Sequence, residues 1–360
     1  MTDNAEKITE YRKQTAKKLI FIGICAVLLL VLLGYSVIVG YSNISFSEAY
    51  GYIWDGITGN GPEPGSDEWR HYYTVIHARL PEAVFAAIAG AGLAVGGAAM
   101  QNVMNNPLAD PYTTGISSGA SLGVTVAAVL GFTLVDGGMF SSLGKVVNAF
   151  VFSLLPMAMI VLVSRRMNTS PATLILAGVA MSYFLGSMTS LLMLMADDNT
   201  LKEIMVWQMG NIANLTWDDV PLMAAVCGVG MVVIYGLSQK LNILSMGDAG
   251  AKALGVDVKK IRLVCLIILS LMVSSVVSFA GIIGFVGLVC PHIVRMIINS
   301  DNKFVVPGAA MLGALMLLAA KLLSTTLSTY GVSVPVGVVI SFVGAPIFLY
   351  LIVRRDSNVW

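Results

Sequence analysis

The sequence predicts an all-α integral membrane protein with about ten transmembrane helices, and three observations carry this prediction. The chain has 360 residues, of which 57% are hydrophobic and only 11% are charged, whereas soluble domains carry about 25% charged residues. Ten apolar runs approach the roughly 20 residues that an α-helix needs to cross a bilayer. Lys and Arg gather in alternate segments between these runs, as the positive-inside rule predicts for a multi-pass protein.

Short polar segments separate the ten predicted spans. The spans cover residues 19–40, 81–103, 113–132, 146–164, 172–195, 219–238, 261–281, 284–299, 304–323 and 334–353. Sixteen Lys and Arg residues fall in the segments that this order makes cytoplasmic, and five fall in outer segments or their span ends. We therefore predict a plasma-membrane protein with both termini in the cytoplasm. Its parts are an N-terminal tail (1–18), one transmembrane domain (19–355) and a C-terminal tail (356–360).

The first span and the outer segment after it have distinct patterns. The apolar run at 19–40 is longer than the core of a signal peptide, which has about 7 to 15 residues, so we predict a retained span. Residues 46–57 are predicted to form an interfacial helix with Ser45 or Ser47 at its N-cap. The Gly- and Pro-rich residues 60–66 are predicted to form a loop.

The segment 279–291 combines an apolar character with glycines at 281, 284 and 287. One interpretation is close helix packing, which small residues permit. The interpretation we favour is a broken span whose freed carbonyl groups are covered by neighbouring helices, a device that membranes tolerate only where protein surrounds the break. A broken span of this kind indicates a pathway through the protein.

The longest polar island between two late spans is segment 245–262, which carries six charged residues. Burying such charges at a bilayer centre costs about 2.5 to 3.5 kcal/mol each, so the segment must lie in water. Its composition predicts two short helices with a break at Gly255. A partner protein outside the membrane could bind such a rigid unit on the cytoplasmic face and transmit force to the spans. The alternative is a solvated loop whose Lys residues only set topology.

Two cytoplasmic turns contain proline at positions that fix the backbone. Segment 105–112 contains Pro107 and Pro111, which predict a rigid hairpin between the second and third spans. At 168–171, Thr169 or Ser170 is predicted to cap the fifth span, with Pro171 at its first helical position.

Composition and motifs exclude several classes of function. A net charge of +1 gives no basic surface for nucleic acid, and the four Cys residues lie in apolar runs without metal-ligand spacing. The spans show no central Asp, Glu or His of the kind that binds a coupling ion in secondary carriers. With no catalytic pairing evident, we predict no enzyme activity, no metal site and no cofactor. Gly144-Lys145 lacks the flanking residues of a phosphate-binding loop, so any ATP and Mg²⁺ must bind a partner.

Ordered motifs recur from about residue 70 to the last span. They are R-L-P at 79–81, N-P-L-A-D-P at 106–111, Gly115 to Gly119, L-A-G at 176–178, Trp207 with Met209-Gly210, G-D to G-V at 247–256, G-F-V-G-L-V-C-P-H-I-V-R at 284–295, P-V-G at 335–337 and G-A-P at 344–346. In these motifs the chain resembles the FecCD family of ABC-importer permeases, which take up iron-siderophore chelates, haem or vitamin B12. The resemblance implies the type II, vitamin B12-permease-like fold with ten spans. It also implies a homodimer, two ATPase subunits below it and a substrate-binding protein outside.

The resemblance assigns roles to individual residues. It implies a cytoplasmic gate at Asn168, Thr169 and Ser170, and a second gate at Asn106 and Leu108. It implies ATPase coupling through residues of the polar island, namely Gly247, Asp248, Ala251, Lys252, Leu254, Gly255 and Val256. Arg79 matches an outward arginine that meets a carboxylate of the binding protein, an interaction that steers docking more than it tightens it.

The chain departs from the family pattern at three outer positions. Glu82 stands where many members have a second arginine, and Ser333 replaces a usual glutamate. Lys321 lies where members usually have an acidic residue and then an arginine. We therefore expect a rewired docking surface to which Lys321 contributes.

These patterns lead to one hypothesis and two rivals. The hypothesis is the membrane subunit of an ATP-driven importer that moves a metal chelate inward by alternating access, with iron-siderophore favoured over haem or cobalamin. One rival is an ATP-independent carrier or channel. The other is an intramembrane enzyme, which the lack of a nucleophile with a base disfavours.

Overall fold

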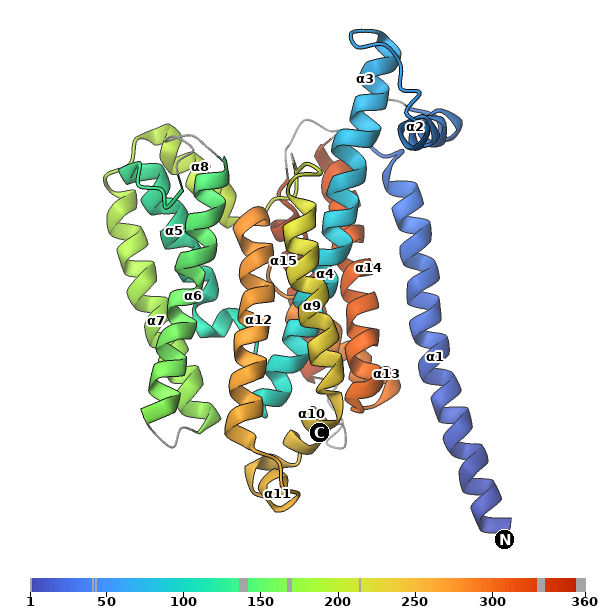
Figure 1. Ribbon diagram of the computed structural model, residues 1–360, viewed down its shortest axis with the longest axis vertical. Helices are drawn as coiled ribbons and strands as arrows, with labels where there is room; N and C mark the ends of the chain where they lie inside the picture. The colour runs from blue at the N-terminus through green and yellow to red at the C-terminus, as the bar shows by residue number, and fades with distance from the viewer. Residues whose placement is uncertain are drawn as a thin grey trace.

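The computed structural model describes residues 2–40, 42, 44–135, 142–166, 170–213, 215–328 and 334–353, and no strand occurs among them. The helices are α1 (Thr2–Ser36), α2 (Phe46–Thr58), α3 (Asp67–Tyr73), the π-helix η1 (Thr74–Arg79), α4 (Leu80–Val103), the 3₁₀ helix η2 (Pro111–Thr114), α5 (Ile116–Leu130), α6 (Ser142–Arg166), α7 (Pro171–Met193), α8 (Asp198–Gln208), α9 (Val220–Gly236), α10 (Ser238–Leu244), α11 (Gly247–Ala253), α12 (Val258–Ala280), α13 (Val286–Ile298), α14 (Asn302–Ser328) and α15 (Val336–Val353). Figure 1 places the N-terminus and α11 at one end of the bundle, which we call the lower end, and α2 and α3 at the upper end.

Within the described residues, six helical segments are long and apolar enough to cross a membrane, and α9 with α10 forms a seventh candidate bent by 60°. Three shorter apolar helices, α5, α13 and α15, complete the set. Together these segments overlap all ten predicted runs, so the predicted all-α membrane fold with about ten spans is confirmed. The described part of the predicted N-terminal tail is helical and continues into α1, whereas residues 356–360 lie outside the described residues.

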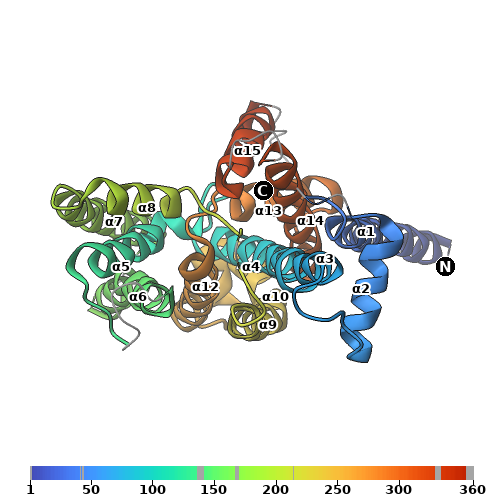
Figure 2. The same ribbon diagram turned by 90° about the horizontal axis from the view of Figure 1, so that it is seen from above.

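The centre of the bundle is α4, which has 20 of its 24 residues buried. Figure 2 shows α9 and α12 on one side of it and α13 and α14 on the other. The sequence permits this burial because α4 consists mainly of Ala, Gly and Val. A Cβ atom added at Gly90 would overlap the backbone of Gly313 in α14, and one added at Gly97 would overlap the backbone of Gly287 in α13. Close packing therefore depends on glycine at these crossings.

The predictions for the upper segment between α1 and α4 are confirmed in part. Helix α2 begins after Ser45, whose hydroxyl accepts from the Glu48 N–H while the Glu48 carboxylate accepts from the Ser45 N–H. This reciprocal capping box explains why the helix begins there. The helix that contains the predicted second span (81–103) begins earlier, because α3, η1 and α4 run as one helical segment of 37 residues from Asp67 to Val103. Ser66 caps this segment at its N-terminus, well before Pro81.

Candidate functional site

The seven predicted coupling residues lie together in one helix-turn unit at the lower end. Helix α11 ends before Gly255, whose φ of 77° produces the predicted break, and α12 begins at Val258. Ala251 is fully buried and Val256 packs against the core, whereas Lys252, Leu254 and Gly255 are exposed. The unit projects below the bundle in Figure 1. Its exposed face is available to a partner, and its buried face attaches it to the membrane domain.

Asp248, also predicted as a coupling residue, contacts a residue that the sequence analysis did not single out. Its two carboxylate oxygens accept hydrogen bonds of 2.8 and 3.3 Å from the guanidinium of Arg262 in α12. The Nε–H of Arg262 donates a third bond of 3.0 Å to the carbonyl oxygen of Val103, the last residue of α4. Arg262 was counted among the cytoplasmic loop charges, but its side chain is 7% exposed and ion-paired.

Arg295, counted among the cations near the cytoplasmic span ends, is a buried residue. It is 1% exposed within α13, where its guanidinium hydrogen-bonds the Gln101 side chain and the Ala98 carbonyl oxygen of α4. Asn302 at the start of α14 exchanges hydrogen bonds of 2.9 and 3.1 Å with Asn102. Side chains from α12, α13 and α14 therefore hold the last two turns of α4.

The hairpin after α4 carries the predicted gate residues Asn106 and Leu108. The Asn106 side chain accepts a 3.0 Å hydrogen bond from the Leu108 N–H, and its own N–H donates to the Gln101 carbonyl oxygen. Leu108 is 47% exposed. Asp110 then accepts from the Tyr112 N–H and begins η2. The predicted rigid hairpin is thus hydrogen-bonded internally as well as restrained by its prolines.

The other predicted gate lies mainly outside the described residues, since Asn168 and Thr169 are not among them. Ser170 is described, and its hydroxyl accepts from the Thr173 N–H, with Pro171 as the first residue of α7. The predicted cap is confirmed at Ser170, while the gate role of all three residues stays a prediction.

The predicted broken span lies between α12 and α13. The Ala280 carbonyl oxygen accepts a 2.7 Å hydrogen bond from the Asn211 N–H. The Ile283 carbonyl oxygen accepts a 3.0 Å bond from the hydroxyl of Tyr112. Neighbouring segments therefore cover the freed carbonyl groups, as predicted.

Two pockets adjoin this break and share Gln208 and Ile282. The first, of about 290 Å³, is lined mainly by side chains with hydroxyl or amide groups, among them Ser117, Ser118, Ser121, Thr189, Ser190 and Gln208. The second, of about 490 Å³, extends along Gly284, Gly337, Ser341 and Phe342. Neither pocket is lined by a charged residue. An uncharged, partly polar lining can contact a cargo without binding it tightly.

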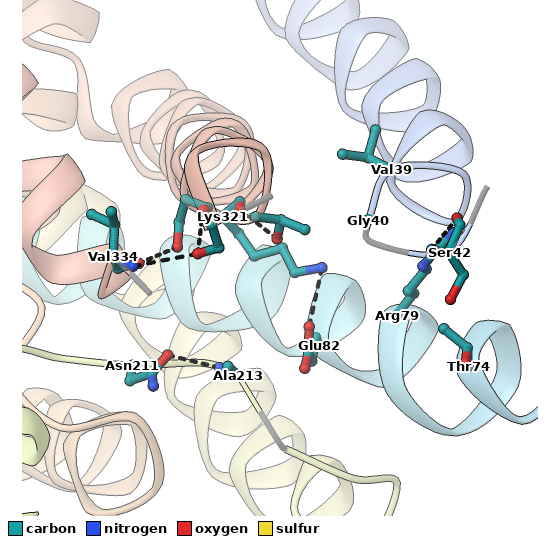
Figure 3. A pocket seen from close by; sticks show the side chains of 13 residues that line it. Val39, Gly40, Ser42, Thr74, Arg79, Glu82, Asn211, Ala213, Lys321 and Val334 are labelled. Atoms are coloured by element: carbon teal, nitrogen blue, oxygen red, sulfur yellow. Dashed lines mark hydrogen bonds and ion pairs between the residues drawn. The ribbon is translucent and has the colours of Figure 1, made fainter. Parts of the chain in front are cut away.

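The residues predicted to dock a binding protein surround a third pocket of about 290 Å³ at the upper end, shown in Figure 3. Arg79 is 5% exposed and donates to the carbonyl oxygens of Val37, Ile38 and Ser42, which ties α4 to the end of α1. Lys321 is ion-paired at 3.1 Å with Glu82. In this structure both cations bind groups of the same chain, so their docking role stays a prediction.

A bundle of span-length apolar helices with uncharged pockets beside the break between α12 and α13 is typical of a membrane transport protein. The chain belongs to the FecCD transport family, whose model matches residues 28–354. Proteins of this family are transport subunits, and this chain is accordingly an ABC transporter permease of the plasma membrane.

Curated relatives and a solved structure agree with this assignment. The hemin transport system permease HmuU of Yersinia pestis is 37% identical over 79% of this chain and 84% of its own length. The Fe(3+)-citrate import permease YfmD of Bacillus subtilis is 32% identical over 96% of this chain and 98% of its own. A structure described as an inward-facing metal-chelate type ABC transporter matches with a TM-score of 0.79 at 26% identity, over 93% of this chain and 99% of that one.

Proposed function

We propose that this chain is the membrane subunit of an ATP-driven importer that moves a bulky metal chelate into the cytoplasm. Two copies would form a pathway between them, and two ATP-binding-cassette ATPases, which bind ATP and Mg²⁺, would dock at the lower end. A substrate-binding protein would dock at the upper end. The named relatives transport hemin and Fe(3+)-citrate, and a metal chelate is the cargo class that they share.

The observation that carries this proposal is the projecting unit formed by α11 and the turn at Gly255. It exposes Lys252 and Leu254 while Ala251 and Val256 attach it to the bundle. A unit of this design can receive a partner on one face and pass its displacement to the spans on the other. The lower end is then cytoplasmic, with both termini on that side, as the distribution of Lys and Arg predicts.

Alternating access in this proposal uses the broken span and the two lower gates. Cargo released by the binding protein meets the uncharged pockets beside Gln208 and Ile282. The hairpin with Asn106 and Leu108, and the turn ending at Ser170, close the pathway below. Small polar or apolar groups suit a gate because they offer no strong ligand that would trap the chelate.

The proposal is tested by the composition and activity of the purified assembly. The chain is co-expressed with a candidate ABC ATPase from the same genome, and native mass spectrometry is expected to show two copies of each. ATP hydrolysis by this assembly in lipid vesicles is expected to rise when the chelate-loaded binding protein is added. A chain that purifies without ATPase, yet forms an open pore or an exchanger, would instead support the ATP-independent carrier or channel.

A further inference from the structure

Arg262 joins three elements that meet at the lower end of the bundle. It belongs to α12. Its guanidinium donates hydrogen bonds to the Asp248 carboxylate in α11, and its Nε–H donates one to the Val103 carbonyl oxygen of α4. The planar guanidinium suits this task because it presents several donors in a fixed arrangement, which a Lys ammonium does not. The Arg262 side chain is 7% exposed and that of Asp248 is 41% exposed, so the pair lies at the boundary between protein and solvent.

Helix α11 buries little of its own surface. Of its seven residues only Ala251 is buried. The turn after it contributes Val256, whose N–H donates a 3.0 Å bond to the Ala251 carbonyl oxygen. Packing against α10 and the chain connections to α10 and α12 also hold α11, and the Asp248–Arg262 ion pair is the side-chain contact that links it to α12. Hydrogen bonds to charged groups are worth about 1.5 to 3 kcal/mol, so the Arg262 bridge is a large part of what fixes the orientation of α11.

Arg262 also contacts the residue that precedes the hairpin 104–110, which carries the two proposed gate residues. Helix carbonyl groups in the last turn lack partners within the helix, and Arg262 supplies one to Val103. The next residues, 104–110, form the hairpin that carries Asn106 and Leu108. Arg295 and Asn302 hold the preceding turn through Ala98 and Asn102. The end of α4 is therefore held on several sides, and Arg262 is the side chain that connects it directly to α11.

We propose that Arg262 is the positioning residue that transmits movement of α11 to the hairpin 104–110, so that an event on the ATPase changes the gate. This inference rests on the proposed function, because it takes α11 as the surface that the ATPase contacts. In this proposal Asp248 moves with α11 and passes the movement to Arg262 through their ion pair, rather than contacting the ATPase. Lys252, which is exposed on the same helix, stays a candidate for contact with the ATPase itself.

The first test examines the bridge without any partner, by amide hydrogen exchange of the full chain in lipid nanodiscs. In Asp248→Asn, which alters only the α11 end, amides of Asn105, Asn106, Leu108 and Ala109 are expected to exchange about tenfold faster, the size that loss of a charge-assisted hydrogen bond predicts. Lys260→Gln, on the exposed face of the first turn of α12, is the matched control and is expected to leave these amides unchanged. Faster exchange confined to residues 247–256 would overturn the inference.

The second test compares ATP hydrolysis with uptake in vesicles that contain the ATPase, with the binding protein and a radiolabelled ferric hydroxamate, haem or cobalamin outside. Arg262→Lys keeps the charge but loses the planar array of donors. It is expected to hydrolyse ATP within about twofold of wild type while transporting at least about tenfold less cargo per ATP. Unchanged cargo per ATP would overturn the inference. A wild-type assembly that shows no ATP-driven uptake would instead overturn the proposed function. The hydrogen-exchange result would still show whether Arg262 links α11 to the hairpin 104–110.

Discussion

At the scale of single residues, glycine sets how closely the central helix approaches its neighbours. Gly97 of α4 and Gly287 of α13 meet so closely that a Cβ added at position 97 would overlap the Gly287 backbone. Backbone atoms have no rotamer to change, so the helices themselves would have to separate. The crossing is therefore a point where one methyl group alters the packing of two spans.

We expect Gly97→Ala to destabilise the protein by about 1 to 3 kcal/mol, the usual cost of overpacking a tight core. Thermal unfolding in detergent measures this change. Gly186→Ala in α7 is the matched control, because an added Cβ there would meet no atom within 4 Å. Equal melting temperatures for Gly97→Ala and the control would show that the crossing is looser than the structure describes.

The residue scale also shows what sequence reasoning missed. Ser170, Ser45 and Gly255 were predicted correctly, because caps and helix breaks depend on near neighbours in the sequence. Arg262 and Arg295 were counted only as cations near cytoplasmic span ends, and their contacts with α4 were not predicted, because Val103, Ala98 and Gln101 lie more than 150 positions away along the chain. The positive-inside rule counts cations by sequence position, so it cannot tell a buried cation from a solvated one.

At the scale of elements, the break between α12 and α13 depends on a hydroxyl from η2. Tyr112 donates to the Ile283 carbonyl oxygen, which no helix hydrogen bond satisfies. We expect Tyr112→Phe to lower the free energy of unfolding by about 1 to 3 kcal/mol, because it leaves a buried acceptor without its donor. Tyr183→Phe, which removes a hydroxyl from a side chain 76% exposed on α7, is the control for thermal unfolding. A loss no larger than that of the control would contradict this role.

The capping box of α2 makes a second prediction at this scale. Hydrogen bonds from the Ser45 side chain and backbone lower the pKa of Glu48 below its ordinary value. A lowered folded-state pKa means that the stabilisation is present above the ordinary glutamate pKa and is lost as pH falls through the folded-state value. We expect amide protection in the first turn of α2, corrected for intrinsic exchange, to decrease when the pH is lowered below about 4. In Glu48→Gln the protection should be independent of pH, and a persistent dependence would assign the effect to another group.

Element limits were predictable where the chain itself signals them, and less so elsewhere. The signal at α2 is the Ser45 and Glu48 pair, and the signal at α7 is Ser170 with Pro171. The second span was predicted from hydropathy alone, which ignores polar helix. In the structure the helix continues upward through polar residues, among which His77 stacks on Tyr73 and Arg79 donates to the Val37 carbonyl oxygen.

At the scale of the whole molecule, one buried helix organises the spans that surround it. The Gly- and Ala-rich α4 packs against α9, α12, α13 and α14 (Figure 2). Its upper end bears the Arg79 and Glu82 pocket, and its lower end leads into the hairpin 104–110. The sequence predicted the spans and their number, because hydropathy is a local property. The central position of α4 was not predicted, because a run of small residues shows only that close neighbours are allowed.

The central claim is that the ATPase drives cargo through this chain, and uptake into vesicles tests it most directly. Vesicles with the chain alone and vesicles with the chain and its ATPase receive the loaded binding protein outside, with and without ATP inside. We predict accumulation of the radiolabelled chelate only when both the ATPase and ATP are present. Equal accumulation by vesicles that hold this chain alone would contradict the account.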